Sequence, residues 1–276
     1  MRFETLGTRL LVAGIFIPLI LFTTLKGGWA FVVLIMIIVG FATAEFYALA
    51  RRKGTSPQAA VGIGAGLAVP VLLFRAGVQP LWLLLAAFTF ITACVELFRN
   101  RGSSTLNLGV TLCGLLVVPV LLGHLILIRE LPVAAARPYH QGGRWIVLML
   151  LTVWVCDTAA YALGTACGKH KLFPRISPNK TWEGAMAGFV AALLCAWGCH
   201  ALFVAGLRLV DSLAIGALCG TAGQLSDLVE SQFKRDAGVK DSSTLIPGHG
   251  GMLDRFDSFI ILAPLAYYYL RFVAMV

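Results

Sequence analysis

One polar stretch, residues 227–257, holds many of the side chains in this sequence that could do chemistry. Six of the thirteen acidic residues fall within it, with four cations among them: Asp227, Glu230, Asp236, Asp241, Asp254 and Asp257, with Lys234, Arg235, Lys240 and Arg255. Carboxylates suit a hard divalent cation, whereas Lys, Arg and the N–H groups of a Gly-rich turn suit phosphate oxygens. A mere connector between membrane helices needs neither this length nor this charge. The stretch therefore predicts a site for a metal and a phosphate-bearing substrate.

The spacing of the acids predicts two helix ends. Asp227, Glu230 and Ser231 stand at i, i+3 and i+4, so they share one face of a helix. Asp254 and Asp257 stand at i and i+3 where the next apolar run begins. There Asp254 is also a good N-cap, and Asp257 favours the positive end of the helix. Both roles are compatible with holding a cation.

Facing acids from two adjacent helix ends would form one carboxylate cluster. With Asp241, we expect this cluster to bind one or two metal ions and to clamp the oxygens of an in-line displacement. Lys234, Arg235 and Lys240 are expected to take the charge of a polyphosphate. His249, between glycines, could donate to a phosphate or leaving group, or could be only structural.

A second polar segment spans residues 157–184. Asp157 lies within an apolar run, where a carboxylate is costly and therefore a functional candidate; a helix–helix hydrogen bond, for example to Tyr161, is the alternative. The Ser177-Pro178 pair predicts a turn, and Thr181 predicts a cap for the next helix. Further polar side chains, which could also anchor lipid headgroups, are Lys169, His170, Lys171, Arg175, Asn179 and Lys180. Headgroup anchoring does not explain Glu183.

Membrane helices must position these segments. The chain has 276 residues, is 59% hydrophobic and 13% charged, and has a mean hydropathy of +0.86. These values are typical of an all-α polytopic membrane protein. We predict nine spans, the first of them uncleaved, at residues 10–25, 29–48, 59–74, 80–97, 107–128, 145–166, 184–206, 209–228 and 256–275.

The distribution of Lys and Arg predicts the orientation. With a cytoplasmic N-terminus, the inside segments hold 15 and the outside segments 7 of the 22 basic residues, so the C-terminus is expected outside. The polar loops 167–183 and 229–255 then both face the cytoplasm. We expect an N-terminal membrane region of about five helices, 1–144, and a catalytic region of about four, 145–276. The net charge of +9 fits membrane phosphates, and because no nucleic-acid-reading motif is present, no nucleic acid partner is expected.

Two apolar runs end in a similar way. Glu45-Phe46 and Glu96-Leu97-Phe98 each place an acid and an aromatic residue before a basic group. The simplest interpretation is an interfacial glutamate paired with a nearby arginine, because helix ends near headgroups tolerate such pairs.

The polar stretch resembles the signature of the phosphatidate cytidylyltransferases, the CDP-diacylglycerol synthases. The matching positions are Ser231, Lys234-Arg235, Lys240-Asp241, Pro247, His249-Gly250-Gly251, Asp254-Arg255 and Asp257. Residues 177–184, SPNKTWEG, are similar to a second motif of the family, with Asn179 where a basic residue is usual. The N-terminal half is similar only as a hydrophobic multi-span region.

The resemblance implies the reaction CTP + phosphatidate → CDP-diacylglycerol + pyrophosphate, a step of phospholipid biosynthesis at the cell (inner) membrane. It also implies about nine helices, a homodimer, and Mg²⁺ beside a monovalent cation such as K⁺. The phosphate of phosphatidate is already a nucleophile near neutral pH. The enzyme therefore has to bring two anions together and stabilise the departing pyrophosphate.

The resemblance and the spacing together assign roles to the candidate residues. The metal ligands are carboxylates, Asp227 and Asp254, with Asp241 and Asp257 in support. The CTP phosphates are assigned to cations, namely Lys234, Arg235 and Lys240, and His249 completes the catalytic set. The remaining expected substrate contacts are Ser177, Lys180, Glu183, Asp157, Ser231, Gly250, Gly251 and Arg255.

Other functions remain compatible with these residues. A CTP-dependent lipid kinase, or a cytidylyltransferase acting on another lipid, would need a similar site. An ion-coupled transporter is less well supported, because it would place acids at mid-depth in several helices and show repeated halves.

Overall fold

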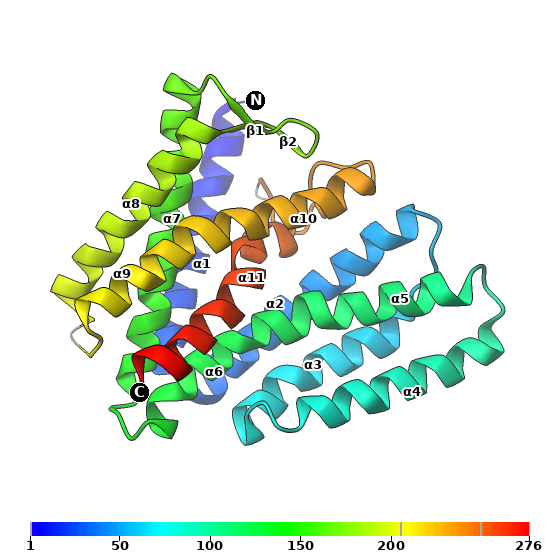
Figure 1. Cartoon of the computed structure of the whole chain (residues 1–276). Helices are drawn as coiled ribbons and strands as arrows, with labels where there is room; N and C mark the ends of the chain where they lie inside the picture. The colour runs from blue at the N-terminus through cyan, green and yellow to red at the C-terminus, as the bar shows by residue number, and fades with distance from the viewer. Residues whose placement is uncertain (1, 205, 249, 276) are drawn as a thin grey trace. The chain divides into compact units, whose positions relative to one another are not determined.

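The computed structural model describes residues 2–204, 206–248 and 250–275, which are mostly helical (Figure 1). The elements in chain order are α1 (Arg2–Lys26), α2 (Gly28–Arg52), α3 (Ala59–Ala76), α4 (Leu81–Arg99), α5 (Ser104–Leu115), η1 (Leu116–Val120), α6 (Leu121–Ala134), α7 (His140–Cys167), β1 (Lys171–Phe173), β2 (Ser177–Thr181), α8 (Trp182–Leu202), α9 (Leu209–Leu218), η2 (Cys219–Gly223), α10 (Gln224–Asp236), α11 (Leu253–Tyr269) and η3 (Leu270–Ala274). The η elements are single π-helical turns. The predicted all-α class is confirmed, with one short β-hairpin added.

Among the described residues, seven helices are long and apolar enough to cross a membrane, as expected of a multi-pass membrane protein. They are Gly28–Arg52, Ala59–Ala76, Leu81–Arg99, Ser104–Ala134, His140–Cys167, Trp182–Leu202 and Leu253–Ala274. Two predicted spans are not among them. The apolar part of α1, Leu11–Lys26, is shorter, and residues 209–228 are divided between α9, η2 and the start of α10. Nine spans and the orientation of the termini stay predictions.

The chain forms two compact units. One unit contains Gly28–Leu127 and Phe233–Phe256, together with the residues before Thr24; the other contains Thr24–Gly27, Ile128–Gln232 and Asp257–Val276. The polar stretch therefore contributes to both units, and α10 and α11 each carry residues of both.

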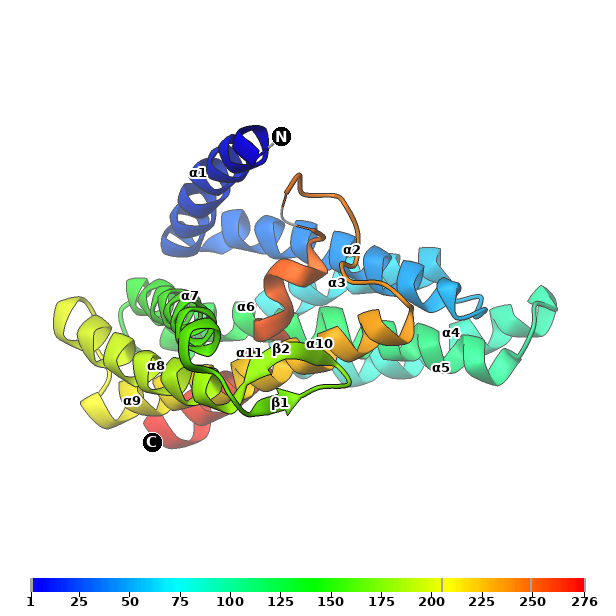
Figure 2. The same cartoon turned by 90° about the horizontal axis from the view of Figure 1, so that it is seen from above.

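In the first unit, α2, α3 and α5 pack against one another (Figures 1 and 2). Tyr47 is fully buried between these helices and donates a hydrogen bond to the Thr111 carbonyl at 2.8 Å. A Cβ atom at Gly114 would lie 2.3 Å from the Tyr47 ring, so only glycine allows this approach. Phe46 and Phe233 meet edge to face with ring centroids 5.3 Å apart, which ties the end of α10 to α2.

In the second unit, α7 and α8 run side by side (Figures 1 and 2). The contact is close because α8 presents small residues: a Cβ atom at Gly184 would lie 2.6 Å from the Ala160 carbonyl oxygen of α7. Helix α9 also packs against α8.

The loop between α7 and α8 contains the antiparallel hairpin β1–β2. The prediction of a turn at Ser177-Pro178 is wrong, because both residues lie in β2. The turn is at Pro174 instead, and the Ile176 N–H donates to the Phe173 carbonyl at 3.1 Å. Pro174 fixes the φ angle that such a turn needs, and a two-stranded hairpin has only edge strands, where proline is tolerated. The predicted cap is confirmed: Thr181 Oγ1 accepts from the Gly184 N–H.

The second polar loop is shorter than predicted. Helix α10 continues to Asp236 and α11 begins at Leu253, so residues 237–252 form the connection instead of 229–255. The charged residues at either end of the stretch are therefore on helices, which fix the direction of their side chains.

Candidate active site

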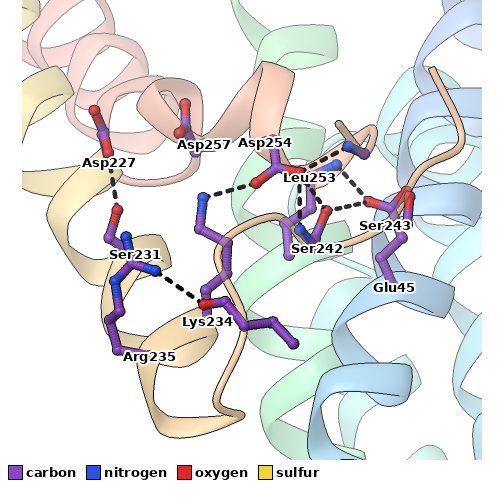
Figure 3. A network of polar contacts seen from close by, with 12 residues as sticks. Glu45, Asp227, Ser231, Lys234, Arg235, Ser242, Ser243, Leu253, Asp254 and Asp257 are labelled. Carbon is purple, nitrogen blue, oxygen red and sulfur yellow. Dashed lines mark hydrogen bonds and ion pairs between the residues drawn. The ribbon is translucent and has the colours of Figure 1, made fainter. Parts of the chain in front are cut away.

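The best-defined polar cluster of the first unit surrounds Asp254, in the first turn of α11 (Figure 3). Lys234, in the last turn of α10, places its ammonium nitrogen 2.7 Å from Asp254 Oδ1. The two side chains are only 10% and 3% exposed. Asp254 Oδ2 accepts from the Ser242 N–H at 2.9 Å, the Ser242 hydroxyl at 2.8 Å and the Gly251 N–H at 2.7 Å. The result is a buried ion pair whose carboxylate is fixed by the loop before it.

The two glycines before α11 make this arrangement possible. Gly250 has a φ of 81° and forms an isolated bridge with Ile246. A Cβ atom at Gly251 would lie 2.0 Å from Ser242 Oγ. Gly251 was expected to bind phosphate through its N–H group, which here donates to Asp254. The prediction that Asp254 is the N-cap is wrong, because α11 begins one residue earlier, at Leu253. The Asp254 side chain accepts from the N–H of Gly251, which precedes the helix.

The remaining signature cations of this unit are accessible. Arg235, Lys240 and Arg255 are exposed, as is Asp241. Arg235 also donates to the Val239 carbonyl at 3.0 Å, which holds the start of the loop against α10. Exposed guanidinium and ammonium groups are available to an anionic substrate. His249 lies outside the described residues.

In the second unit, Asp227 lies in the first turn of α10 and pairs with Lys180 of β2, with the two charged atoms 2.7 Å apart. Ser231, one turn further along α10, donates to the other oxygen at 3.2 Å. Both charged side chains are part-exposed, at 27% for Lys180 and 29% for Asp227. The structure thus brings together three predicted residues from the two polar segments.

Asp257 begins the part of α11 that belongs to the second unit. Its Oδ1 accepts from the Ser258 N–H at 2.6 Å. The carbonyl of Asp257 accepts from the hydroxyl of Ser226, which in turn accepts from the Ile261 N–H at 3.1 Å. These bonds join α10 to α11 next to Asp227.

The other predicted residues of the second unit lie on the hairpin and α7. Glu183 accepts from the ring of His170 at 2.6 Å and from its backbone N–H at 3.2 Å, so it closes the base of the hairpin. Ser177 is half-buried in β2, and Asp157 is exposed on α7. Of this group, Lys180 contacts Asp227 directly.

Comparison with known proteins decides the family. The model of the cytidylyltransferase family matches residues 7–273 of the chain. The chain belongs to the cytidylyltransferase family. A phosphatidate cytidylyltransferase of Staphylococcus aureus (strain COL) is 34% identical over 269 residues, which are 96% of this chain and 97% of that protein. A phosphatidate cytidylyltransferase of Staphylococcus saprophyticus is 47% identical over 125 residues, 45% of this chain and 48% of that protein. As a cytidylyltransferase, the chain is an enzyme that transfers a nucleotidyl group.

The carboxylates of these clusters can be compared with the ligands that Mg²⁺ needs in a cytidylyltransferase. Among the described residues, no group of three or more His, Cys, Asp or Glu side chains is placed to hold a metal ion by itself. Mg²⁺ commonly uses one or two protein carboxylates together with substrate phosphates. The Asp227 side chain is part-exposed, so its oxygens can still accept a ligand bond. Oδ1 of Asp254 accepts one hydrogen bond, from Lys234, and a carboxylate oxygen has a second lone pair for an ion. This donor chemistry fits.

Sequence reasoning missed three residues of the polar cluster around Asp254. Glu45 of α2 and the hydroxyls of Ser242 and Ser243 form a network with the loop that holds Asp254. The serines stand in the signature stretch but were not singled out. Glu45 was interpreted as half of an interfacial pair with arginine, and this is wrong, because its partners are uncharged donors of residues 242–253. Its position at the end of an apolar run was the available signal.

Proposed function

We propose that this chain transfers the cytidylyl group of CTP to phosphatidate and releases pyrophosphate, forming CDP-diacylglycerol for phospholipid biosynthesis. The observation that carries the proposal is the buried Lys234–Asp254 pair inside the signature stretch. It occurs in a chain that is similar over almost its whole length to a phosphatidate cytidylyltransferase. A buried, oriented ammonium group is suited to phosphate charge that develops during the reaction.

The bond changes in this reaction are few. An oxygen of the phosphatidate phosphate attacks the α-phosphorus of CTP, and the bond from that phosphorus to the bridging oxygen breaks. Pyrophosphate leaves with the bonding electrons. Because the attacking phosphate is already an anion, the protein has to offset charge and align the groups, without a strong general base.

The described contacts suggest how the residues divide this work. Lys234 and the exposed cations Arg235 and Lys240 would bind the CTP phosphates and stabilise the leaving pyrophosphate. Lys180, on the hairpin with Ser177, would bind the phosphatidate headgroup. The ion pair of Lys180 with Asp227 orients the ammonium group towards α10. Arg255 is a further exposed cation for either anion.

Mg²⁺ belongs to this proposal, with Asp227 and Asp254 as the residues that would hold it. When bound, the ion neutralises phosphate charge and polarises phosphoryl oxygens. Asp241, which is exposed, and Asp257 would support the site.

The proposal also includes the membrane in which the chain lies, the number of its spans and its orientation. The chain would lie in the cell inner membrane with nine spans, a cytoplasmic N-terminus and both polar loops facing cytoplasmic CTP. The excess of Lys and Arg in the inside segments supports this orientation. A monovalent cation such as K⁺ and a homodimer remain predictions from the family resemblance.

A labelling experiment tests the reaction. The protein is reconstituted with phosphatidate in lipid nanodiscs and given CTP that is radiolabelled at either the α- or the γ-phosphate. We expect α-label in the lipid product, γ-label in pyrophosphate, and loss of both products with a chelator of divalent cations. Transfer of the γ-label to lipid would instead identify a lipid kinase.

The variant Asp227→Asn tests the metal assignment. We expect a rise of about tenfold or more in the Mg²⁺ concentration that gives half-maximal activity, because one ligand charge is lost. Asp236→Asn, on the same helix and exposed, is the matched control and should leave this concentration unchanged. Equal Mg²⁺ dependence in both variants would remove Asp227 from the metal site.

A further inference from the structure

Glu45 is a buried carboxylate far from the signature in sequence. It lies on α2, with 6% of the residue exposed, near the helix end that carries Arg51 and Arg52. Removing a carboxylate from water is costly unless hydrogen bonds or charges compensate for it. The partners of Glu45 therefore indicate what its burial serves.

All four donors to Glu45 come from the loop before α11 and from the start of that helix. Figure 3 shows Glu45 with Ser242, Ser243 and Leu253. Oε1 accepts from the Ser243 hydroxyl at 2.6 Å and from the Met252 N–H at 3.0 Å. Oε2 accepts from the Ser242 hydroxyl at 3.0 Å and from the Leu253 N–H at 2.7 Å. Each oxygen thus holds one side chain of the loop and one backbone group of the α11 start.

The two backbone bonds make Glu45 a cap for α11 that is supplied by another helix. The first N–H groups of a helix have no partner within the helix, and together they form its positive end. A carboxylate at this position satisfies two of them and is favoured by the helix dipole. The start of α11 is fixed in this way, and Asp254 lies in its first turn.

Glu45 is also coupled directly to the surroundings of Asp254. The Ser242 hydroxyl lies 3.0 Å from Glu45 Oε2 and 2.8 Å from Asp254 Oδ2, so the two carboxylates share its single proton. A Cβ atom at Gly251 would lie 2.6 Å from both oxygens of Glu45, so the chain passes against this carboxylate. Any displacement of Glu45 must move Ser242, Gly251 or the first turn of α11.

We propose that Glu45 is a positioning residue of the reaction: through Ser242, Ser243 and the first turn of α11 it holds the Asp254–Lys234 pair in place for the phosphates. This inference rests on the proposed function. Glu45 does not itself need to contact CTP or phosphatidate. Its charge matters because all four of its partners are donors, which an amide nitrogen at the same place would repel.

The test compares Glu45→Gln with Glu96→Gln. Glu96 of α4 is buried to the same extent, at 4% exposed, but accepts from Gln58, Asn107 and Arg99, away from the loop. Both variants are prepared in nanodiscs. The measurements are kcat, KM for CTP, the melting temperature, and hydrogen exchange of the backbone amides of residues 242–253.

For Glu45→Gln we expect kcat to fall by about 10- to 100-fold, as small misplacements of reacting groups can cause, with KM changed by less than about threefold. Exchange in residues 242–253 should become faster. Both variants should lower the melting temperature by a similar amount, because each weakens a buried hydrogen-bond network. In Glu96→Gln, however, kcat should stay within about twofold of the wild type, and exchange in residues 242–253 should stay unchanged. Glu45→Asp, which keeps the charge on a shorter side chain, should recover part of kcat.

Two results would overturn the proposal. One is unchanged kcat and unchanged loop exchange in Glu45→Gln; the other is an equal loss of kcat in both variants at equal melting temperature.

If Glu45→Gln does not fold, Ser243→Ala removes one donor from Glu45 and leaves the bonds of Asp254 intact. A wild-type level of kcat and exchange in Ser243→Ala would then also count against the proposal. If the wild-type protein makes no CDP-diacylglycerol, the proposed function fails, while the exchange data still decide whether Glu45 holds the loop.

Discussion

Glu45 and Glu96 occupy similar places in the sequence, yet they do different things in the fold. Each lies within the last two turns of an apolar helix, precedes aromatic and basic residues, and is buried. Glu96 accepts from Arg99, one turn along its own helix, at 3.0 Å and from the amides of Gln58 and Asn107 at 2.8 Å. Glu45 accepts from two hydroxyls and two backbone N–H groups about 200 residues further along the chain. The interpretation as a pair with a nearby arginine is confirmed for Glu96 and wrong for Glu45.

The difference lies in what each carboxylate holds. The partners of Glu96 join α4, α5 and the start of α3, so this network links helices of the scaffold. The partners of Glu45 are the loop and helix start that also hold Asp254. A buried polar network in which every group is hydrogen-bonded makes the segments that carry those groups rigid. The first network should therefore contribute mainly to stability, and the second mainly to the geometry of the reaction.

The largest effect is expected at the far end of the Glu45 network. Asp254→Asn removes the charge opposite the buried Lys234 and turns an amide nitrogen towards donors. We expect CDP-diacylglycerol formation to fall by roughly 100- to 1,000-fold, as when a preorganised charge is lost from an active site. The product is quantified with saturating CTP and Mg²⁺. Near-normal turnover would show that the pair is structural and would remove the contrast with Glu96.

A smaller effect, of a different kind, is expected in the Glu96 network. Asn107→Ala takes one donor from Glu96 and leaves the Ser56 N–H without its 2.7 Å acceptor. Because these groups are buried or part-buried, the variant should lose about 1–3 kcal/mol of stability. Thermal melting in detergent should show the loss, while kcat below the transition stays within about twofold. A large loss of kcat without destabilisation would show that this network also serves the reaction.

The smallest effect is expected for a surface link between the same two helices that Glu45 and Lys234 occupy. Lys53, just after α2, pairs with Asp236 of α10 at 3.2 Å, and the side chains are 49% and 65% exposed. Solvent screens such a pair, so Lys53→Ala should change stability by less than about 0.5 kcal/mol and leave turnover unchanged. Melting and turnover are measured beside Glu45→Gln. A clear loss of turnover would mean that any link between α2 and α10 matters, whether or not it is buried.

Much of the site could be predicted because its chemistry is local in sequence. The residues around Asp254 stand within one stretch, and Asp227 and Ser231 share a helix face at i and i+4, as expected. The Thr181 cap follows a short-range rule and was also predicted. The turn at Pro174 was missed because two neighbouring prolines both favour turns, and only strand pairing selects between them.

The sequence by itself determined that this is a helical membrane protein with one stretch suited to phosphate chemistry. Composition determines that the long apolar segments partition into the membrane. Spacing determines which side chains share a helix face. The tertiary structure alone decided that Lys180 meets Asp227 across 47 residues and that Glu45 caps a helix 208 residues away. Such contacts depend on which helices pack together, and in similar apolar helices that choice is made by the fit of buried side chains. Two similar sequence patterns, at Glu45 and Glu96, could therefore end in different networks.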